Sequence, residues 1–335
     1  MTVPSISREE LAALKLLAVD LDFSDAEREA VLLEKGSRDV NAAPGSGKTT
    51  VLAAKLLLLA KKWPFDRRGI CVLSHTKVAR DEIRKRLSAT PEGSRLLEYP
   101  HFIGTIHSFV DRFLALPFLR SKGVVIDIID DEAFERRAIA LAMKDRTLGF
   151  RARKDAGVLK TARSLVYVGE ELKLGSQEGR LPRDTTDSYA AFKEIKGKLT
   201  RQGVFRYADM FAFAQHLLKR STGLETLAVA RFPLVFVDEM QDTSWAQEEL
   251  LEKLFHSGAV TQRFGDINQR ILGKGEDATK LTFPRGNALP IRTSKRFGAA
   301  IASVVAGVQV GGEAVTGEAS DVHHPLLIAY CPNRV

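Results

Sequence analysis

The sequence predicts an α/β protein built on a parallel β-sheet, with an all-helical subdomain inserted into it. Three observations predict this fold. Short apolar runs alternate with amphipathic helical patterns early in the chain, a glycine-rich loop joins the first run to its helix, and the alternation returns near residue 232. Such runs are typical of buried parallel strands whose connecting helices cover the sheet. With 335 residues, the chain is long enough for two or three domains.

The first part of the chain gives these elements in order. The first two expected helices each have acidic residues in the first turn followed by apolar residues at helical spacing. A proline marks the expected end of the helix over 107–116. We expect helices over 8–19, 25–33, 51–60, 77–87 and 107–116, ending at Pro117, and strands over 69–74 and 102–105.

From about residue 130 to 220, strand-like runs nearly vanish and Arg and Lys become frequent. Helices are expected here over 132–143 and 189–199. Charged residues on a helix usually face water, and that interpretation stays open for any single cation. Arg151 to Lys154 and Arg163 are the first candidates for contact with a phosphate backbone. The α/β pattern then resumes, with strands expected over 232–237 and 259–264, a helix over 246–254 and a final strand over 325–330.

The overall composition favours a soluble protein with an electrostatic bias towards binding polyanions. The net charge is +8, although a positive charge alone separates nucleic-acid-binding proteins only weakly from other basic proteins. The two cysteines, Cys71 and Cys331, are too few for a disulfide framework and lie in apolar runs, so we expect reduced thiols and a cytoplasmic protein. Apolar runs are far shorter than a membrane span, so no membrane partner is expected.

The glycine-rich loop has the composition of a phosphate-binding loop. Its glycines let successive N–H groups point at one anion, and the helix that starts at Lys48 adds its positive end. Lys48 would reach the β- and γ-phosphates, and Thr49 would offer a hydroxyl to Mg²⁺. The strict pattern has Gly where Ala42 stands, and a plain turn before a helix is the alternative. The candidate phosphate-binding residues are Ala43, Pro44, Gly45, Ser46, Gly47, Lys48, Thr49 and Thr50.

A second motif supplies the acids that such a loop needs. The apolar run 234–237 ends at Asp238 and Glu239. In phosphate-loop enzymes an Asp at this place holds Mg²⁺, and an adjacent acid orients the attacking water. We assign these roles to Asp238 and Glu239, with a simple cap of the following helix as the alternative. Because the carboxyl ends of parallel strands share one edge, both motifs are expected there.

The order of these segments resembles the UvrD/Rep/PcrA group of superfamily 1 helicases, which are ATP-driven motors on single-stranded DNA. The resemblance implies RecA-like motor-domain parts over 1–115 and 204–288, a helical insertion over 116–203, and the start of a truncated second RecA-like domain over 289–335. It is carried, besides the loop, by Phe23 to Val31, Ser74 to Thr76, Gly104 to Phe109, Tyr207 to Met210, Asp238 to Thr243 with Gln247, Gly265 to Gln269, and Ser294 to Phe297.

The same resemblance implies roles for single residues. Glu27 falls at the adenine-reading position, Gln269 at the position that senses the γ-phosphate, and Arg296 at that of an arginine reaching it from the second motor domain. Lys77, which stands where the family commonly has Asn, would add a phosphate contact. The implied DNA-contacting residues are His75, Thr76, Lys77, Thr105 and His107.

The chain also departs from the family pattern. Glu27 replaces a glutamine, and a carboxylate cannot donate a hydrogen bond to the adenine ring. Aromatic residues of the family are replaced by His75, Leu272, Lys274 and Lys295. Each lost stacking platform removes roughly 1–3 kcal/mol of base binding in single-strand binders.

These observations lead to one main functional hypothesis and two rivals. The main one is an ATP-dependent DNA helicase or translocase of UvrD type, with ATP and Mg²⁺ as cofactors and single-stranded or tailed duplex DNA as partner, moving 3′ to 5′ by family analogy. The second is a DNA-stimulated NTPase switch working with a partner nuclease or repair protein, as in phage defence. The third is a non-enzymatic nucleic-acid-binding module. Because the later family motifs are absent, we expect a fragment of a longer protein, with weak activity alone.

Overall fold

The structure is a computed structural model that describes residues 3–17, 25–256, 258–270, 280–309 and 314–320, with the backbone alone for 13–17. It divides into two compact units. Unit 1 takes Met1–Thr105 with Thr226–Val335, and unit 2 takes Ile106–Glu225. Each unit has its own hydrophobic core, so each is described by itself.

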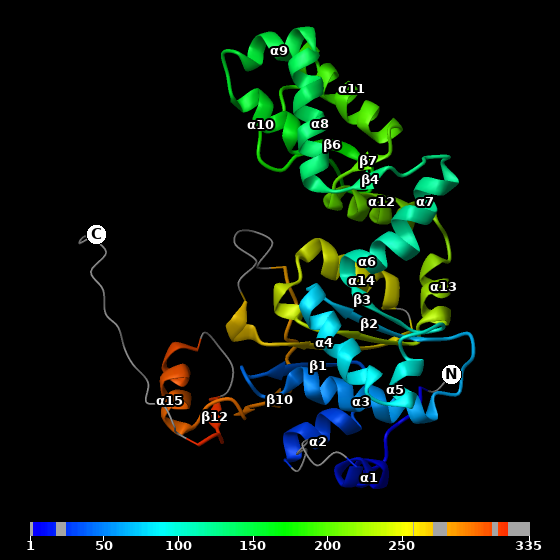
Figure 1. Ribbon diagram of the computed structural model, residues 1–335, viewed down its shortest axis with the longest axis vertical. Helices are drawn as coiled ribbons and strands as arrows, with labels where there is room; N and C mark the ends of the chain where they lie inside the picture. Colours follow the sequence, from blue (N-terminus) through cyan, green and yellow to red (C-terminus); the bar gives the residue numbers. More distant parts are fainter. Residues whose placement is uncertain (1–2, 18–24, 257, 271–279, 310–313, 321–335) are drawn as a thin grey trace, which may run out of the picture. The chain divides into compact units, whose positions relative to one another are not determined.

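Unit 1 is organised around a sheet of six parallel strands (Figure 1). The neighbouring interior strands β8 (Leu234–Val237) and β2 (Ile70–Ser74) are buried along their whole lengths, which explains why their sequences are almost continuously apolar. Since every neighbouring pair is parallel, all carboxyl ends lie at one edge. In spatial order the strands are β10 (Leu289–Ile291), β1 (Arg38–Ala42), β9 (Val260–Gly265), β8 (Leu234–Val237), β2 (Ile70–Ser74) and β3 (Phe102–Thr105).

Helices cover both faces of this sheet. The connections from β1 to β2 and from β2 to β3 run in one direction along the sheet, whereas the connection from β8 to β9 runs back. Right-handed crossovers therefore place α3 and α4 on one face and α14 on the other, as Figure 1 shows. The helices of unit 1 are α1 (Arg8–Leu17), α2 (Ala26–Leu33), α3 (Lys48–Lys62), α4 (Lys77–Ser88), α5 (Pro91–Arg95), most of α13 (Leu224–Arg231), α14 (Trp245–Phe255) and α15 (Ala299–Val308).

A buried ionic network ties the middle of the sheet to α14. Arg263 on β9 donates from Nε to Asp39 on the neighbouring strand β1 at 2.7 Å, and from Nη1 to Glu248 of α14 at 2.7 Å. All three side chains are at most 4% exposed. A buried charge is tolerated only when paired, so this network fixes the register of β9 against its neighbours.

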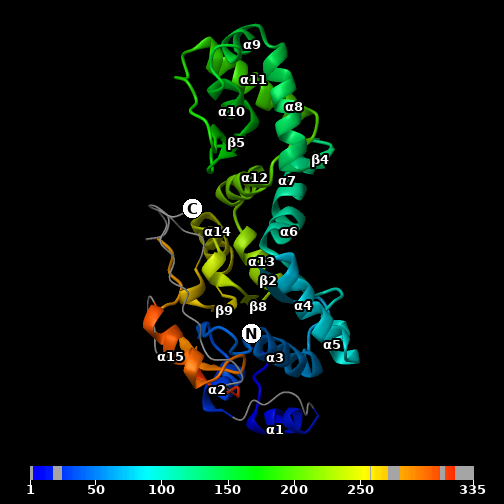
Figure 2. The same cartoon turned by 60° about the vertical axis from the view of Figure 1, so that its left-hand side comes forward.

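Unit 2 is mainly helical but also contains two small sheets. Its core gathers α8, α9, α10 and α11, which cluster in Figures 1 and 2. The helices are α6 (Ile106–Val110), a π-helical turn Asp111–Ala115, α7 (Leu116–Ser121), α8 (Asp131–Lys144), α9 (Arg146–Ala152), α10 (Gly157–Arg163), α11 (Asp187–Arg201) and α12 (Tyr207–Arg220). The sheets pair β4 (Ile128–Ile129) with β7 (Val204–Phe205), parallel, and β5 (Leu165–Val168) with β6 (Lys173–Ser176), antiparallel.

The α/β fold class with an inserted helical unit is confirmed, with corrections in detail. The insertion is not all-helical, because the β-prone run Leu165–Val168 forms a hairpin. The helix expected over 107–116 does not end at Pro117 but continues to Ser121. The π-helical turn places Pro117 in the first turn of α7, where its missing N–H needs no partner.

The unit boundaries differ from the expected domain boundaries. Unit 2 begins at Ile106 rather than 116 and ends at Glu225 rather than 203, because α6 and α7 pack on α12. In addition β10, expected to open a second motor domain, is paired with β1 in the main sheet. The assignment of the residues after 291 to a second motor domain stays a prediction, and the strand expected over 325–330 lies outside the described residues.

Two smaller expectations concern cysteine and membranes. Cys71 is a free, fully buried thiol, as expected, and burial raises its pKa. Cys331 lies outside the described residues. Within the described part of the chain, every helix is too short or too polar to cross a membrane.

Candidate nucleotide-binding site

The loop between β1 and α3 has the backbone of an anion cradle. Gly45 and Gly47 have φ of +72° and +78°, in the left-handed region that a side chain rarely adopts. Gly47 directly precedes the first turn of α3, which contains no acidic residue. The N–H groups at this helix start therefore present an uncompensated positive end.

Arg28 of α2 holds the loop in place through hydrogen bonds to the loop backbone. Its guanidinium donates to the carbonyl oxygen of Ser46 from Nε at 3.1 Å and from Nη2 at 2.7 Å. Nη2 also donates to the carbonyl oxygen of Thr293 at 2.8 Å, and the side chain is only 3% exposed. Sequence reasoning missed Arg28, although an arginine next to the buried apolar stripe of an amphipathic helix is a usable signal.

Lys48, Asp238 and Glu239 come together at the carboxyl edge of the sheet. The Lys48 ammonium forms an ion pair with Oε2 of Glu239 and lies 3.8 Å from Oδ1 of Asp238. Burial raises the pKa of Asp238 to about 6, against the opposing effect of Lys48. Burial would also raise the pKa of Glu239, but the charge and hydrogen bond of Lys48 lower it overall. The two acids are thus held in different environments.

The backbone at Glu239 is unusual for a residue with a side chain. Its φ of +57° and ψ of +45° lie in the left-handed region. A non-glycine residue in that region costs roughly 1–2 kcal/mol, and such outliers gather at functional sites. The turn aims the Glu239 carboxylate back towards Lys48, in agreement with a positioned acid.

Gln241 joins Glu239 to the next strand end. Its Nε2 donates to Oε2 of Glu239 at 2.6 Å, and its Oε1 accepts from the backbone N–H of Asp266 at 3.0 Å. Gln241 is 2% exposed, so this bridge is shielded from water. Gln241 falls within the motif Asp238 to Thr243, where no separate role was expected of it. The structure identifies it as the side chain that orients Glu239.

Gln269 lies on the same side of the site. It ends the 3₁₀-helical turn Ile267–Gln269 after β9, where its backbone N–H donates to the carbonyl oxygen of Asp266 at 3.1 Å. A cavity of about 370 Å³ is lined by Gln269 together with Thr76, Glu239 and Gln241. The structure therefore brings Gln269 and Glu239 to one cavity. That Gln269 senses the γ-phosphate stays a prediction.

Arg296 lies directly beside the loop. The backbone N–H of Lys295 donates to the carbonyl oxygen of Gly45 at 3.0 Å. A Cβ atom built on Gly45 would lie 2.5 Å from Cβ of Arg296 and 2.7 Å from Oγ of Ser294. This approach requires a glycine at position 45, and it places the predicted arginine next to the predicted phosphate cradle.

The predicted adenine-reading residue is already engaged by the protein. Oε2 of Glu27 accepts from the backbone N–H of Arg292 at 2.7 Å, and Oε1 pairs with Nη1 of Arg292 at 2.9 Å. The neighbouring Arg28 reaches the loop itself, so Glu27 does lie close to the cradle. Its base-reading role stays a prediction, and Phe23 and Ser24 lie outside the described residues.

The predicted DNA-contacting residues fall into both units. In unit 1, Thr76 caps α4 by accepting the backbone N–H of Ala79 at 3.1 Å, and both Thr76 and Lys77 are exposed. His75 precedes them, and Thr105 ends β3, 8% exposed. In unit 2, the ring of His107 packs edge-on against Phe211 of α12 at 4.9 Å. Their contacts with DNA stay predictions. Leu272 and Lys274 lie outside the described residues.

The donor atoms at this edge fit Mg²⁺ better than a tightly held transition metal. The second carboxylate oxygen of Asp238, Oδ2, is buried without a hydrogen-bond partner in the described structure, and Thr49 stands in the first turn of α3. Among the described residues no group of three His, Cys, Asp or Glu side chains could hold a metal by itself. Mg²⁺ characteristically uses one or two protein oxygens together with water and substrate phosphates.

Comparison with known proteins agrees with this geometry. Residues 23–273 match the family model "UvrD/REP helicase N-terminal domain". A probable DNA helicase II homolog of Mycoplasma pneumoniae is 27% identical over 267 residues, covering 76% of this chain and 36% of that protein. DNA helicase II of Haemophilus influenzae is 24% identical over 262 residues, covering 75% and 34%. ATP-dependent DNA helicase Rep of Buchnera aphidicola is 22% identical over 259 residues, covering 76% and 38%.

The chain therefore spans about a third of the length of these relatives. The family model, in contrast, covers well over half of the chain and includes the loop, both acids and Gln269. On this match, and on the site geometry that accompanies it, the chain belongs to the UvrD/REP helicase N-terminal domain family.

Proposed function

We propose that this chain is the nucleotide-hydrolysing motor part of a DNA helicase or translocase, which uses Mg²⁺ and ATP and acts on single-stranded or tailed duplex DNA. The observation that carries the proposal is the meeting of Lys48, Asp238 and Glu239 at the loop between β1 and α3. Family membership supports helicase function. ATP as the nucleotide, movement along single strands and 3′ to 5′ polarity belong to the proposal.

The protein's own residues would do the following in that reaction. The loop N–H groups and Lys48 bind the triphosphate, and Thr49 and Asp238 hold Mg²⁺, which neutralises charge that develops on the phosphates. When the triphosphate binds, Lys48 leaves its ion pair with Glu239 and binds the phosphates instead. The Glu239 carboxylate is then free to orient the attacking water. Gln241 keeps Glu239 in place during the exchange, since it holds the same oxygen.

Arg296 and Gln269 would couple the phosphate to movement. Arg296 lies against the loop at Gly45, and Gln269 shares a cavity with Glu239 and Thr76. A change at the γ-phosphate would therefore reach both the segment after β10 and the exposed turn at Thr76 and Lys77. We propose that turn, with His75 and Thr105, as the DNA contact of unit 1.

Two measurements on the purified chain test this proposal. The first is binding of a fluorescent ATP analogue with Mg²⁺, and the second is phosphate release with and without single-stranded DNA. Lys48→Ala should weaken binding and lower turnover by about a hundredfold, the scale of one lost charge-stabilising donor. Lys61→Ala, an exposed lysine of the same helix, is the matched control and should leave both unchanged.

Glu239→Gln separates chemistry from binding. It keeps the shape of the side chain but removes the carboxylate, so it should retain nucleotide binding and lose turnover. DNA-stimulated hydrolysis that survives in Lys48→Ala would refute the assignment. Equal losses in Lys48→Ala and Lys61→Ala would do the same. The alternative of an NTPase switch working with a nuclease in phage defence gains no support from the comparisons, and we do not propose it.

A further inference from the structure

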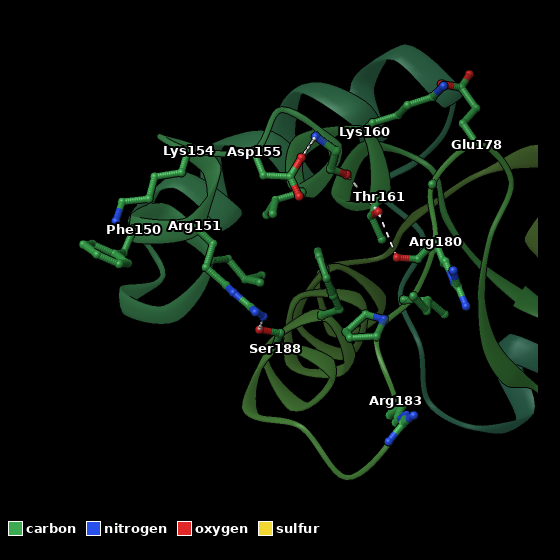
Figure 3. A pocket seen from close by; sticks show the side chains of 17 residues that line it. Phe150, Arg151, Lys154, Asp155, Lys160, Thr161, Glu178, Arg180, Arg183 and Ser188 are labelled. Atoms are coloured by element: carbon green, nitrogen blue, oxygen red, sulfur yellow. Dashed lines mark hydrogen bonds between the residues drawn. The ribbon is translucent and has the colours of Figure 1, made fainter.

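Unit 2 contains a large cavity that the nucleotide site does not use. It has a volume of about 800 Å³ and is lined by residues of α9, α10, the segment after β6 and the start of α11 (Figure 3). Pockets that bind small molecules and cofactors usually have volumes of about 300–1,000 Å³, so this cavity is large enough to take up a side chain. All of its lining residues belong to unit 2, so the cavity is complete within one compact unit.

The floor of the cavity is apolar. Leu148 and Phe192 lie beneath it and are at most 3% exposed, while Val158, Leu181 and Pro182 are half-buried along its sides. Buried aliphatic and aromatic carbon cannot bind an ion, but it can bind an apolar side chain of about the size of Leu or Phe.

The rim of the cavity is cationic. Five exposed cations, Arg151, Lys154, Lys160, Arg180 and Arg183, line it together with two carboxylates, a formal charge of +3. Glu178 pairs with Arg163, which lies outside the lining, whereas Asp155 accepts the backbone N–H of the lining residue Gly157 at 2.8 Å and pairs with none of the rim cations. The positive charge of the rim is therefore not balanced from within the cavity.

None of the five cations of this rim forms an ion pair with another described residue. Arg151 is held differently, since its Nη1 donates to Oγ of Ser188, which fixes the guanidinium over the cavity (Figure 3). Cations that stand around a recess without partners are arranged to meet an anion from outside.

An exposed aromatic ring stands at the same rim. Phe150 is 62% exposed, and the ammonium of Lys154 lies 4.8 Å from the centre of its ring. Large exposed aromatic side chains beside a recess are typical anchors of protein contacts, because they bury much area with little loss of conformational freedom.

We propose that this cavity is a docking site for an acidic segment of a partner protein, in which a Leu or Phe side chain is flanked by Asp and Glu. The apolar residue enters the floor over Leu148 and Phe192. The flanking carboxylates meet Arg180 and Arg183 on one side and Lys154 on the other. A nucleic-acid backbone would use the cations but leave the aliphatic floor without a partner, so the cavity fits the acidic segment better.

The test uses the full chain and one defined probe, a fluorescein-labelled peptide with Phe and Leu at its centre and Asp and Glu on both sides. Fluorescence anisotropy should show saturable binding that weakens with salt. Two matched peptides, one with Asn and Gln for the acids and one with Ser for Phe and Leu, should each bind at least about tenfold more weakly. Labelled single-stranded and duplex DNA are measured in parallel.

Variants of the chain locate the binding. Lys154→Glu and the double variant Arg180→Glu with Arg183→Glu should each lower peptide affinity by at least about tenfold. Arg153→Glu is the matched control, because Arg153 is also exposed and directly adjacent but does not line the cavity. It should change the affinity by less than about twofold. Circular dichroism checks that each variant keeps its fold, as expected for exposed positions.

The following results would overturn the proposal. The wild-type chain fails to bind the acidic peptide, or binds the neutral peptide equally well. Arg153→Glu weakens binding as much as Lys154→Glu, which would mean general charge attraction. A third such result is that the chain binds DNA but not the peptide, and that Lys154→Glu abolishes the DNA binding. The cavity would then be a nucleic-acid site.

Discussion

The contact between Gly45 and the segment after β10 gives a sharp prediction about stability. Gly45→Ala adds a methyl group that would lie 2.5 Å from Cβ of Arg296 and 2.7 Å from Oγ of Ser294. Oγ of Ser294 can rotate away, but Cβ of Arg296 is fixed by its own backbone, so the backbone around residue 296 has to move. Gly47→Ala is the matched control, since its φ of +78° is nearly the same but its nearest contact, Cβ of Thr50, lies at 3.8 Å.

The two variants share one cost and differ in a second. An alanine in the left-handed region costs about 1–2 kcal/mol, of which about 0.4–1 kcal/mol is offset because alanine restricts the unfolded chain. Gly47→Ala should therefore lower the free energy of unfolding by about 1 kcal/mol. Gly45→Ala adds the cost of overpacking, about 1–3 kcal/mol, for a total of about 2–4 kcal/mol.

Urea unfolding followed by tryptophan fluorescence measures the difference. The chain has two tryptophans, Trp63 and Trp245, and both belong to unit 1, so the signal reports the unit that holds the loop. Partial proteolysis gives a second readout, because a displaced segment 294–296 should be cleaved faster in Gly45→Ala than in Gly47→Ala. Equal losses of stability in both variants, with equal proteolysis, would refute the close approach of Arg296 to the loop.

Two further predictions concern buried charges of unit 1. Arg263→Met leaves the carboxylates of Asp39 and Glu248 without their shared cation and should lower the free energy of unfolding by about 3–5 kcal/mol, measured in urea. Arg86→Met, at a partly exposed ion pair with Glu82, should cost less than about 1 kcal/mol. Similar small losses in both variants would contradict the buried network. Burial lowers the pKa of Lys55 from 10.5 to about 7, so the unfolded chain binds more protons there and stability should rise as pH increases from about 7 towards 10.5. Lys55→Met should flatten that rise by up to about 1.4 kcal/mol per pH unit, and parallel stability curves at about pH 7 and 9 for the two proteins would count against it.

Much of the site was accessible to sequence reasoning because its signals are local. The glycines of the loop, the two acids after an apolar run and the short strands each occupy a few consecutive residues. The parallel arrangement then brings strand ends together without further information, and the structure places Lys48, Asp238, Glu239 and Gln269 at one edge accordingly. Their chemical roles follow from the family and from the proposal, and the experiments above test them.

The contacts that position these residues could not be predicted in the same way. The pairing of Glu27 with Arg292 joins residues 265 positions apart, and no local pattern marks it. The support of the Ser46 carbonyl by Arg28 and the bridge from Gln241 to Asp266 depend on how elements pack. The hairpin at Leu165–Val168 was different, because four β-prone residues before Gly169 are a local signal that the frequent Arg and Lys obscured.

The short run from Leu289 to Lys295 is held by other parts of unit 1 along its whole length. Strand pairing to β1 holds its start, Glu27 and Arg28 hold its middle, and the Gly45 carbonyl holds its end. A displacement of residues 289–295 would therefore have to break these contacts or move the loop before α3 with it. The next stretch is bound as well, because Thr293–Ser294 pair with Thr316–Gly317 and the carbonyl oxygen of Phe297 accepts the backbone N–H of Ala319. Residues 316–319 are therefore coupled to the loop before α3 through a single short segment of chain.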